Sequence, residues 1–272
     1  MTFSTSSPKP TIAFFGATGG CAHSCLVHTL KAGYNVSALA RTPSKLTSQL
    51  LADGLTQEIL DQHLVITQGN SKDVAAVKRT LCPDKDGNIV SKIVSGIGGT
   101  PKLTLNPLRP LSISDPTICE QSAITLIQAL RELQSTHKGS SKPLISFVST
   151  TGVARPGKPR DVPIAFLFLY HYLIAVPHID KRKLEELISQ NVAETDESKR
   201  VFRDLVGVRA SLLLGGVTSK GGKGLDKVRA GTEDKPAVGY TITRADVGEW
   251  LFENTVRKDG EGFLGEFVTL TN

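Results

Sequence analysis

The chain has 272 residues, which is enough for one α/β domain with a well-buried core but short for two independent domains. With 39% hydrophobic and 21% charged residues, it has the composition of a globular protein and not of a disordered or fibrous one. The net charge is +6, but Lys and Arg are scattered without interleaved aromatic residues. This pattern argues against nucleic-acid binding and slightly favours a small anionic ligand.

Residues 1–10 are rich in Ser, Thr and Pro and contain no apolar stretch, so we expect a disordered tail and no secretory signal. The four cysteines show no paired CxxC spacing, which predicts reduced thiols in a cytoplasmic protein. Cys21 and Cys25 lie one helical turn apart, but two thiols without further ligands are weak evidence for a metal site. We predict no metal.

Short β-like runs alternate with longer segments of helical period along the chain. The expected strands are 11–15, 36–40, 64–68, 89–95, 144–149, 208–214 and 267–270. The expected helices are 21–32, 44–51, 57–60, 73–81, 118–135, 179–189 and 243–257. Such alternation predicts an α/β protein with a doubly wound parallel sheet, the Rossmann fold, and a small C-terminal lobe on the substrate side. We expect residues 11–272 to form one domain in which residues 153–240 contribute most of that side.

A glycine-rich turn, residues 15–22 (FGATGGCA), follows the first expected strand and opens the first expected helix. Glycines let the backbone turn tightly and approach a pyrophosphate, while free N–H groups at the helix N-terminus hold its negative charge. We therefore predict dinucleotide contacts at Gly16, Thr18, Gly19 and Gly20. The alternative is a tight strand-to-helix turn that binds nothing.

The second expected strand ends in basic residues, where NAD-binding proteins carry an acidic residue for the ribose hydroxyls. Arg41, Thr42 and Lys45 follow this strand. A guanidinium holds a phosphate by two parallel hydrogen bonds, so these three residues predict NADP(H) as the cofactor. A solvated basic turn is the alternative.

These motifs resemble the atypical short-chain dehydrogenase/reductases with an NmrA-like or flavin-reductase-like NAD(P)-binding domain. The resemblance covers nearly the whole chain and is carried by residues 16–20 (GATGG), 41–42 (RT), 94–99 (VSGIGG), 148–152 (VSTTG) and 243–247 (TRADV). It implies that Gly96 and Gly98 border the adenosine ribose and that Thr150 faces the nicotinamide.

Members of this family that reduce carbonyls usually carry a Tyr four residues before a Lys, which together bind the nicotinamide ribose and donate a proton. Here Lys181 is followed four residues later by Glu185, as in that helix, but Pro177 occupies the tyrosine position. We still expect Lys181 to contact the cofactor and to take part in catalysis. An exposed helical lysine is the alternative.

Another group must then donate the proton. The candidates are Ser149, Thr150, Thr151, Tyr170, Tyr172 and His178. His178 lies just before the expected helix 179–189, where a capping or packing histidine is the alternative.

The apolar segment 162–176 is too short to span a membrane and contains His171, so we predict no membrane span. It could form the wall of an apolar substrate pocket or pack in the core. The basic, glycine-rich residues 219–224 are interpreted either as a mobile flap over the cofactor or as a surface turn.

The leading hypothesis is an NADPH-dependent oxidoreductase acting on a small apolar carbonyl, quinone or enone-like molecule. Because the Tyr-x-x-x-Lys pair is missing, two alternatives remain: an NmrA-like NADP(H)-binding redox sensor without catalysis, and an isomerase that retains its cofactor. We expect a small-molecule substrate and a monomer or homodimer.

Overall fold

The computed structural model describes residues 9–84, 87–99, 101–103, 111–137, 139, 141–166 and 175–272. Its main element is an eight-stranded sheet in the order β10-β12-β8-β7-β4-β1-β2-β3. Seven of these strands are parallel: β1 (Ile12–Phe15), β2 (Val36–Ala40), β3 (Leu64–Gln68), β4 (Lys92–Ser95), β7 (Leu144–Thr150), β8 (Asp204–Ala210) and β12 (Glu266–Thr271). The short edge strand β10 (Arg229–Gly231) is antiparallel to β12.

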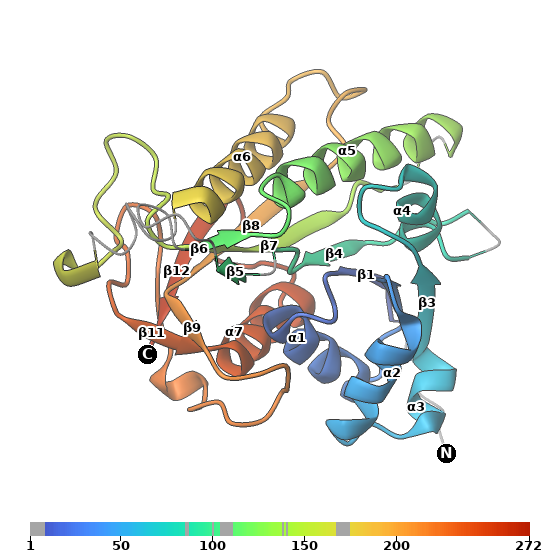
Figure 1. Cartoon of the computed structure of the whole chain (residues 1–272). Coiled ribbons are helices and arrows are strands. Elements are labelled where there is room, and N and C mark those ends of the chain that lie inside the picture. The colour runs from blue at the N-terminus through green and yellow to red at the C-terminus, as the bar shows by residue number, and fades with distance from the viewer. Residues whose placement is uncertain are drawn as a thin grey trace, which may run out of the picture.

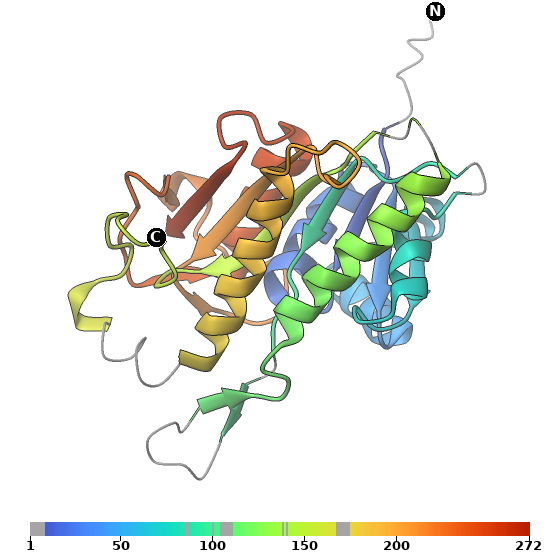
Figure 2. The ribbon, with the colours of Figure 1, turned by 90° about the horizontal axis from the view of Figure 1, so that it is seen from above.

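Helices cover both faces of this sheet (Figures 1 and 2). One face carries α1 (Gly20–Lys31), α2 (Pro43–Ala52), α3 (Gln57–His63) and α7 (Arg244–Leu251). The other face carries α4 (Val74–Leu81), α5 (Ile118–Thr136) and α6 (Ala175–Val192). This arrangement is the predicted doubly wound α/β fold, with the carboxyl ends of its parallel strands at one edge.

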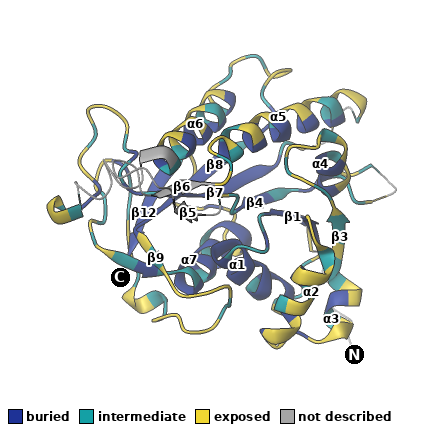
Figure 3. Ribbon diagram, viewed as in Figure 1, coloured by how far each residue is buried: buried dark blue, intermediate teal, exposed yellow. Residues whose placement is uncertain are grey.

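The central strands are buried on both faces, as Figure 3 shows. Along β1, Ile12 and Phe14 pack into the apolar cluster beneath α1 and α7, whereas Ala13 and Phe15 pack into the cluster beneath α4, α5 and α6. Successive side chains of a strand point to opposite faces, so a strand covered twice must be apolar throughout. The sequence of β1, IAFF, therefore needs no polar position.

Most expected elements are confirmed, and the departures have local causes. The expected strand 208–214 divides at Ser211, whose N–H donates to Leu270 O; beyond it, β9 (Leu212–Leu214) pairs with β11 (Thr241–Thr243) in a separate small sheet. The last expected helix becomes π-helical over Phe252–Arg257. The helix expected to begin at residue 179 begins at Ala175.

Several short elements were not expected. The proline-containing segment after β4 was interpreted as a loop, but it holds a hairpin of β5 (Pro101–Leu103) and β6 (Leu111–Ile113). Three-residue strands are too short to produce a readable alternation, and the same holds for β10 and β11. Short 3-10 turns also occur at Ile164–Phe166 and Leu225–Lys227.

Within the described ranges, no helix combines the length and apolar character needed to cross a bilayer. Of the apolar segment 162–176, residues 167–174 lie outside the described residues. Its predicted role as a pocket wall therefore stays a prediction.

Candidate cofactor and active site

The glycine turn after β1 is tied directly to the end of β4. Gly16 has φ +71°, a left-handed conformation that favours glycine, and a Cβ there would lie 2.7 Å from the carbonyl carbon of Gly96. The Gly19 N–H donates to Gly16 O at 2.8 Å, which closes the turn. A Cβ on Gly96 would in turn lie 2.6 Å from Cβ of Ala22. Two segments predicted as cofactor contacts, 16–20 and 96–98, are thus in direct contact.

The N-terminus of α1 is open to an anion. Gly19 is its N-cap, with an extended backbone and no side chain to cap the helix, and the first turn contains no acidic residue. Thr18 and Gly19 are half-buried. Uncapped N–H groups and the positive end of the helix dipole bind phosphate groups well. The residues present therefore fit the pyrophosphate of a dinucleotide.

A cation that the sequence analysis did not single out lies beside this N-terminus. A Cβ on Gly20 would lie 2.4 Å from Cδ of Arg244 and 2.8 Å from Gly216 O. The Arg244 guanidinium donates to Gly215 O and Leu213 O. The sequence indicated only that Arg244 belongs to a family segment; its proximity to Gly20 comes from the packing of α7 against α1.

The loop 215–224 is held at two points by carboxylates, which argues against a mobile flap, one of the two interpretations given above for residues 219–224. Asp53 accepts hydrogen bonds from Thr218 Oγ1 and Ser219 N, each at 2.6 Å. Asp246 accepts from the N–H groups of residues 223 and 224 and from Thr243 Oγ1. The loop is therefore a fixed wall beside α1.

The basic residues predicted to select NADP(H) lie at the carboxyl end of β2. Arg41, Thr42 and Lys45 are all exposed, and Thr42 is the N-cap of α2. Among the described residues, neither Arg41 nor Lys45 has a carboxylate within ion-pair distance. Both cations are therefore available to a phosphate beyond the end of β2.

Lys181 bridges the ends of two central strands. Its Nζ donates to Ile97 O at 2.7 Å, after β4, and to Val148 O at 2.6 Å, in β7. These two bonds fix the ammonium in the region where the resemblance places the nicotinamide ribose and leave one N–H for a ligand. Gly98, the neighbouring predicted contact, is exposed, with open space where a Cβ would be.

His178 lies in the first turn of α6, so its expected place before a helix was wrong. The helix begins earlier because Pro177 needs no hydrogen-bonded N–H in a first turn. The ring is buried, and Nε2 lies 3.0 Å from Thr151 O. A carbonyl oxygen only accepts, so Nε2 carries the proton and ties α6 to the loop after β7.

The three hydroxyls at the end of β7 have different surroundings. Ser149 is buried; its Oγ has no partner of normal hydrogen-bond geometry, although it lies near enough to Glu185 to lower the pKa of that carboxyl. Thr151 is also buried. Thr150 is half-buried, with Oγ1 3.2 Å from Thr151 O, and is the most accessible of the three. Tyr170 and Tyr172 lie outside the described residues.

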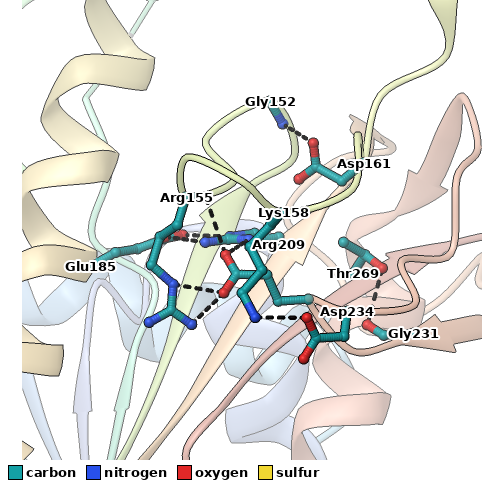
Figure 4. Close-up of polar contacts among 10 residues, drawn as sticks. Gly152, Arg155, Lys158, Asp161, Glu185, Arg209, Gly231, Asp234 and Thr269 are labelled. Atoms are coloured by element: carbon teal, nitrogen blue, oxygen red, sulfur yellow. Dashed lines mark hydrogen bonds and ion pairs between the residues drawn. The ribbon is translucent and has the colours of Figure 1, made fainter.

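Sequence reasoning missed a buried ion network behind these hydroxyls (Figure 4). Arg209, in β8, is fully buried and pairs with Glu185 of α6 and with Glu233, each at 2.7 Å. Glu233 also pairs with Arg155 in the loop after β7. The one sequence signal was a charged residue, Arg209, between the apolar residues Val208 and Ala210.

The pKa values of the two buried carboxyls in this network shift in opposite directions. Burial raises the pKa of Glu185 even though Arg209 donates two hydrogen bonds to it. Burial also opposes the ionisation of Glu233, but hydrogen bonds from Arg155 and Arg209 lower its pKa to about 2. Glu185, predicted as part of the Lys-x-x-x-Glu pattern, thus serves to hold α6 on β8.

The thiols are not poised for chemistry. Burial raises the pKa of Cys21 to about 12 and that of Cys119 to about 11, in spite of the nearby Lys181. Cys25 is also buried, and only Cys82 is half-buried. Across the described ranges, no group of three or more His, Cys, Asp or Glu side chains is placed to hold a metal ion.

Two fungal proteins are similar to this chain over almost its whole length. Reductase pytE of Aspergillus terreus is 46% identical over 270 residues, covering 98% of this chain and 99% of that protein. Oxidase pynE of Aspergillus niger is 41% identical over 287 residues, covering 97% and 99%. No family model matches the sequence.

Solved structures share the fold at low sequence identity. A short-chain dehydrogenase/reductase from Veillonella parvula, in complex with NADP, is 13% identical with a TM-score of 0.63, covering 97% of this chain and 94% of that one. ChuY, an anaerobilin reductase from Escherichia coli O157:H7, is 16% identical with a TM-score of 0.61, covering 96% of both chains. The chain therefore belongs to one family of oxidoreductases with these two fungal relatives, and it has the Rossmann fold of the NAD(P)-binding short-chain dehydrogenase/reductases.

Proposed function

We propose that the protein is an NADPH-dependent reductase of a small apolar carbonyl, quinone or enone-like molecule. The observation that carries this proposal is the pair of unneutralised cations, Arg41 and Lys45, at the end of β2, on the same edge of the sheet as the uncapped N-terminus of α1. A 2′-phosphate needs the first feature and a pyrophosphate the second. The names of the fungal relatives, a reductase and an oxidase, support redox chemistry.

Each part of the site then has a defined task. When bound, the cofactor supplies the hydride. Lys181, fixed by Ile97 O and Val148 O, orients the nicotinamide ribose with its remaining N–H. Thr150 Oγ1 binds the substrate oxygen and, with water, delivers the proton in place of the missing tyrosine.

The missing tyrosine also favours a second candidate, an NmrA-like redox sensor that binds NADP(H) without catalysis. Pro177 occupies the tyrosine position, and Lys181 already donates two hydrogen bonds to backbone carbonyls. A sensor requires unequal affinities for NADPH and NADP+ and a partner protein.

Calorimetric titration with NADPH, NADP+, NADH and NAD+ tests the cofactor assignment. We expect NADPH to bind at least tenfold more tightly than NADH, and the preference to collapse in Arg41→Ala, because loss of a charge-assisted hydrogen bond costs about 1.5–3 kcal/mol. Arg79→Ala, which removes an exposed arginine from α4, is the matched control. Equal affinities for NADPH and NADH, or no binding of any of the four, would contradict the proposal.

A substrate screen separates the two candidates. Carbonyl, quinone and enone compounds are added to the protein with NADPH, and absorbance at the nicotinamide band is followed. Consumption of NADPH supports the reductase. Tight cofactor binding without consumption, with a partner recovered by pull-down, supports the sensor.

A further inference from the structure

A cavity of about 740 Å³ lies between the loop after β7 and the first turns of α6. This volume is within the range of small-molecule sites. Residues 152–162 form one wall and residues 178–186 the other. The cavity begins two residues beyond Thr150, and buried side chains at its edge, Asp161 and His178, connect it to the end of β7. We call it the β7–α6 cavity.

The lining of the β7–α6 cavity is rich in cations. Its charged members are Arg155, Lys158, Arg160, Arg182, Lys183, Asp161 and Glu186. Five of the seven are therefore basic. Asp161 accepts a hydrogen bond from the Gly152 N–H, so one of the two acidic members is already engaged within the loop.

Three of the five cations are paired with carboxylates that do not line the cavity. The pairs are Arg155–Glu233, Lys158–Asp234 and Lys183–Glu120. Each carboxylate comes from a neighbouring element outside the two walls, so these cations already have counter-charges. Their role is to hold the walls in place.

Arg160 and Arg182 are different. Both are exposed, and neither has a carboxylate within ion-pair distance among the residues that the structure describes. Arg160 comes from the loop wall and Arg182 from the α6 wall. The two arginines therefore line the cavity from two different elements, and guanidinium groups match the planar geometry of a carboxylate.

The loop wall is fixed before any ligand arrives. The Gly152 N–H donates to Asp161 Oδ1 at 3.0 Å, which joins the two ends of the loop (Figure 4). Lys158 Nζ lies 2.6 Å from Asp234 Oδ1, and Arg155 is held by the buried ion network. Because little ordering remains to be done on binding, such a wall favours affinity.

We propose that the β7–α6 cavity binds an acidic group of the substrate, a carboxylate or an ionised enol, between Arg160 and Arg182. This rests on the proposed function, since the reacting oxygen of the same molecule lies at Thr150. The substrate class is thereby narrowed from neutral apolar carbonyl compounds to organic acids with an apolar body.

Equilibrium binding of a matched acid and ester tests the cavity directly. The full chain, saturated with NADP+, is titrated with trans-cinnamate and with methyl cinnamate. We expect cinnamate to bind at least tenfold more tightly than the ester, and R160Q/R182Q to weaken cinnamate at least tenfold while leaving the ester unchanged. The control R79Q/R131Q removes two exposed arginines from α4 and α5 and should change neither affinity by more than about twofold. Equal binding of acid and ester, or an unchanged R160Q/R182Q, overturns the proposal.

Two further measurements test whether the cavity binds a substrate acid, a free inorganic anion or a phosphate of the cofactor. Inorganic phosphate should displace cinnamate only at far higher concentration; displacement at equal concentration would identify a free-anion site and overturn the substrate assignment. NADPH affinity should be unchanged in R160Q/R182Q; its loss would identify a cofactor phosphate and also overturn it. With an acidic substrate from the screen, the double variant should raise KM at least tenfold with little change in kcat.

Failure of the proposed function has a different signature. If the wild-type protein binds no dinucleotide, the reductase proposal fails, whereas the preference for cinnamate over its ester in the cofactor-free protein still reports on the cavity. If cofactor binds and the cinnamate preference is absent, only the present inference fails.

Discussion

The two halves of the sheet are built by different means. Around β1, β2 and β4, the site depends on backbone geometry: Gly16 and Gly96 let two loops touch, and the N-terminus of α1 is left uncapped. Around β7 and β8, it depends on side-chain charges from distant parts of the sequence, with Arg209 at the centre. The first half is therefore shaped mainly by backbone contacts, and the second half by buried ion pairs. Under the proposed function, the first half holds the cofactor and the second half supports the substrate side.

We call the part around β7 and β8 the charged half and the part around β1, β2 and β4 the backbone half. The largest effect on stability is expected from a substitution in the charged half. Arg209→Met leaves Glu185 and Glu233 buried without their common partner, and removal of one member of a buried ion network costs about 3–5 kcal/mol. Urea denaturation should show this loss as a lower midpoint. Arg131→Met, at an exposed position of α5, should leave the midpoint unchanged. A loss below about 1 kcal/mol in Arg209→Met would show that the network does not hold the two sides together.

An intermediate effect is expected from breaking the backbone half. Gly16→Ala combines a left-handed φ with a Cβ only 2.7 Å from Gly96, so it should displace the loop after β4 and weaken NADPH on the order of 100-fold, or ~2.8 kcal/mol. Gly54→Ala is the control, because Gly54 has φ +88° but nothing within 4 Å of its Cβ. It should cost roughly 1–3 kcal/mol of stability through backbone strain alone and leave NADPH affinity intact. If both variants bind NADPH equally, contact between the loops is not what shapes the site.

The smallest effect is a pH dependence of the free energy of unfolding. It comes from His23, a buried side chain of the backbone half. Burial lowers the pKa of His23, which lies 3.1 Å from Asp53. The unfolded chain therefore binds the proton more readily, and stability falls as pH drops below the ordinary histidine pKa of about 6.5. The free energy of unfolding at pH 7.5, 6.5 and 5.5 should decline, and His23→Gln should flatten the decline. Identical slopes in the two proteins would exclude His23 as its source.

The sequence allowed the backbone half to be predicted because its signals are local. A strand, a glycine turn and a helix follow one another within about twenty residues, and Arg41 follows the next strand. The boundaries of β2 and β3 were predicted correctly for the same reason.

The charged half could not be predicted in the same way. Arg209 lies 24 residues after Glu185 and 24 residues before Glu233. Nothing in the local sequence around any of the three indicates its partners. His178 was predicted as a candidate proton donor, but whether it packs or reacts depends on Thr151, 27 residues away. Short strands such as β5 and β6 were missed because tertiary pairing, and not periodicity, defines them.

The burial of Cys21, Cys25 and Cys119 has a practical and a biological consequence. Burial raises the pKa of all four thiols, so exposure decides between them: alkylating reagents and peroxide should modify the half-buried Cys82 selectively, which makes it a single-site anchor for a fluorescent label. For the same reason, a redox signal carried by a cysteine thiol of this protein must enter through Cys82, because the other three thiols are shielded from the reagent.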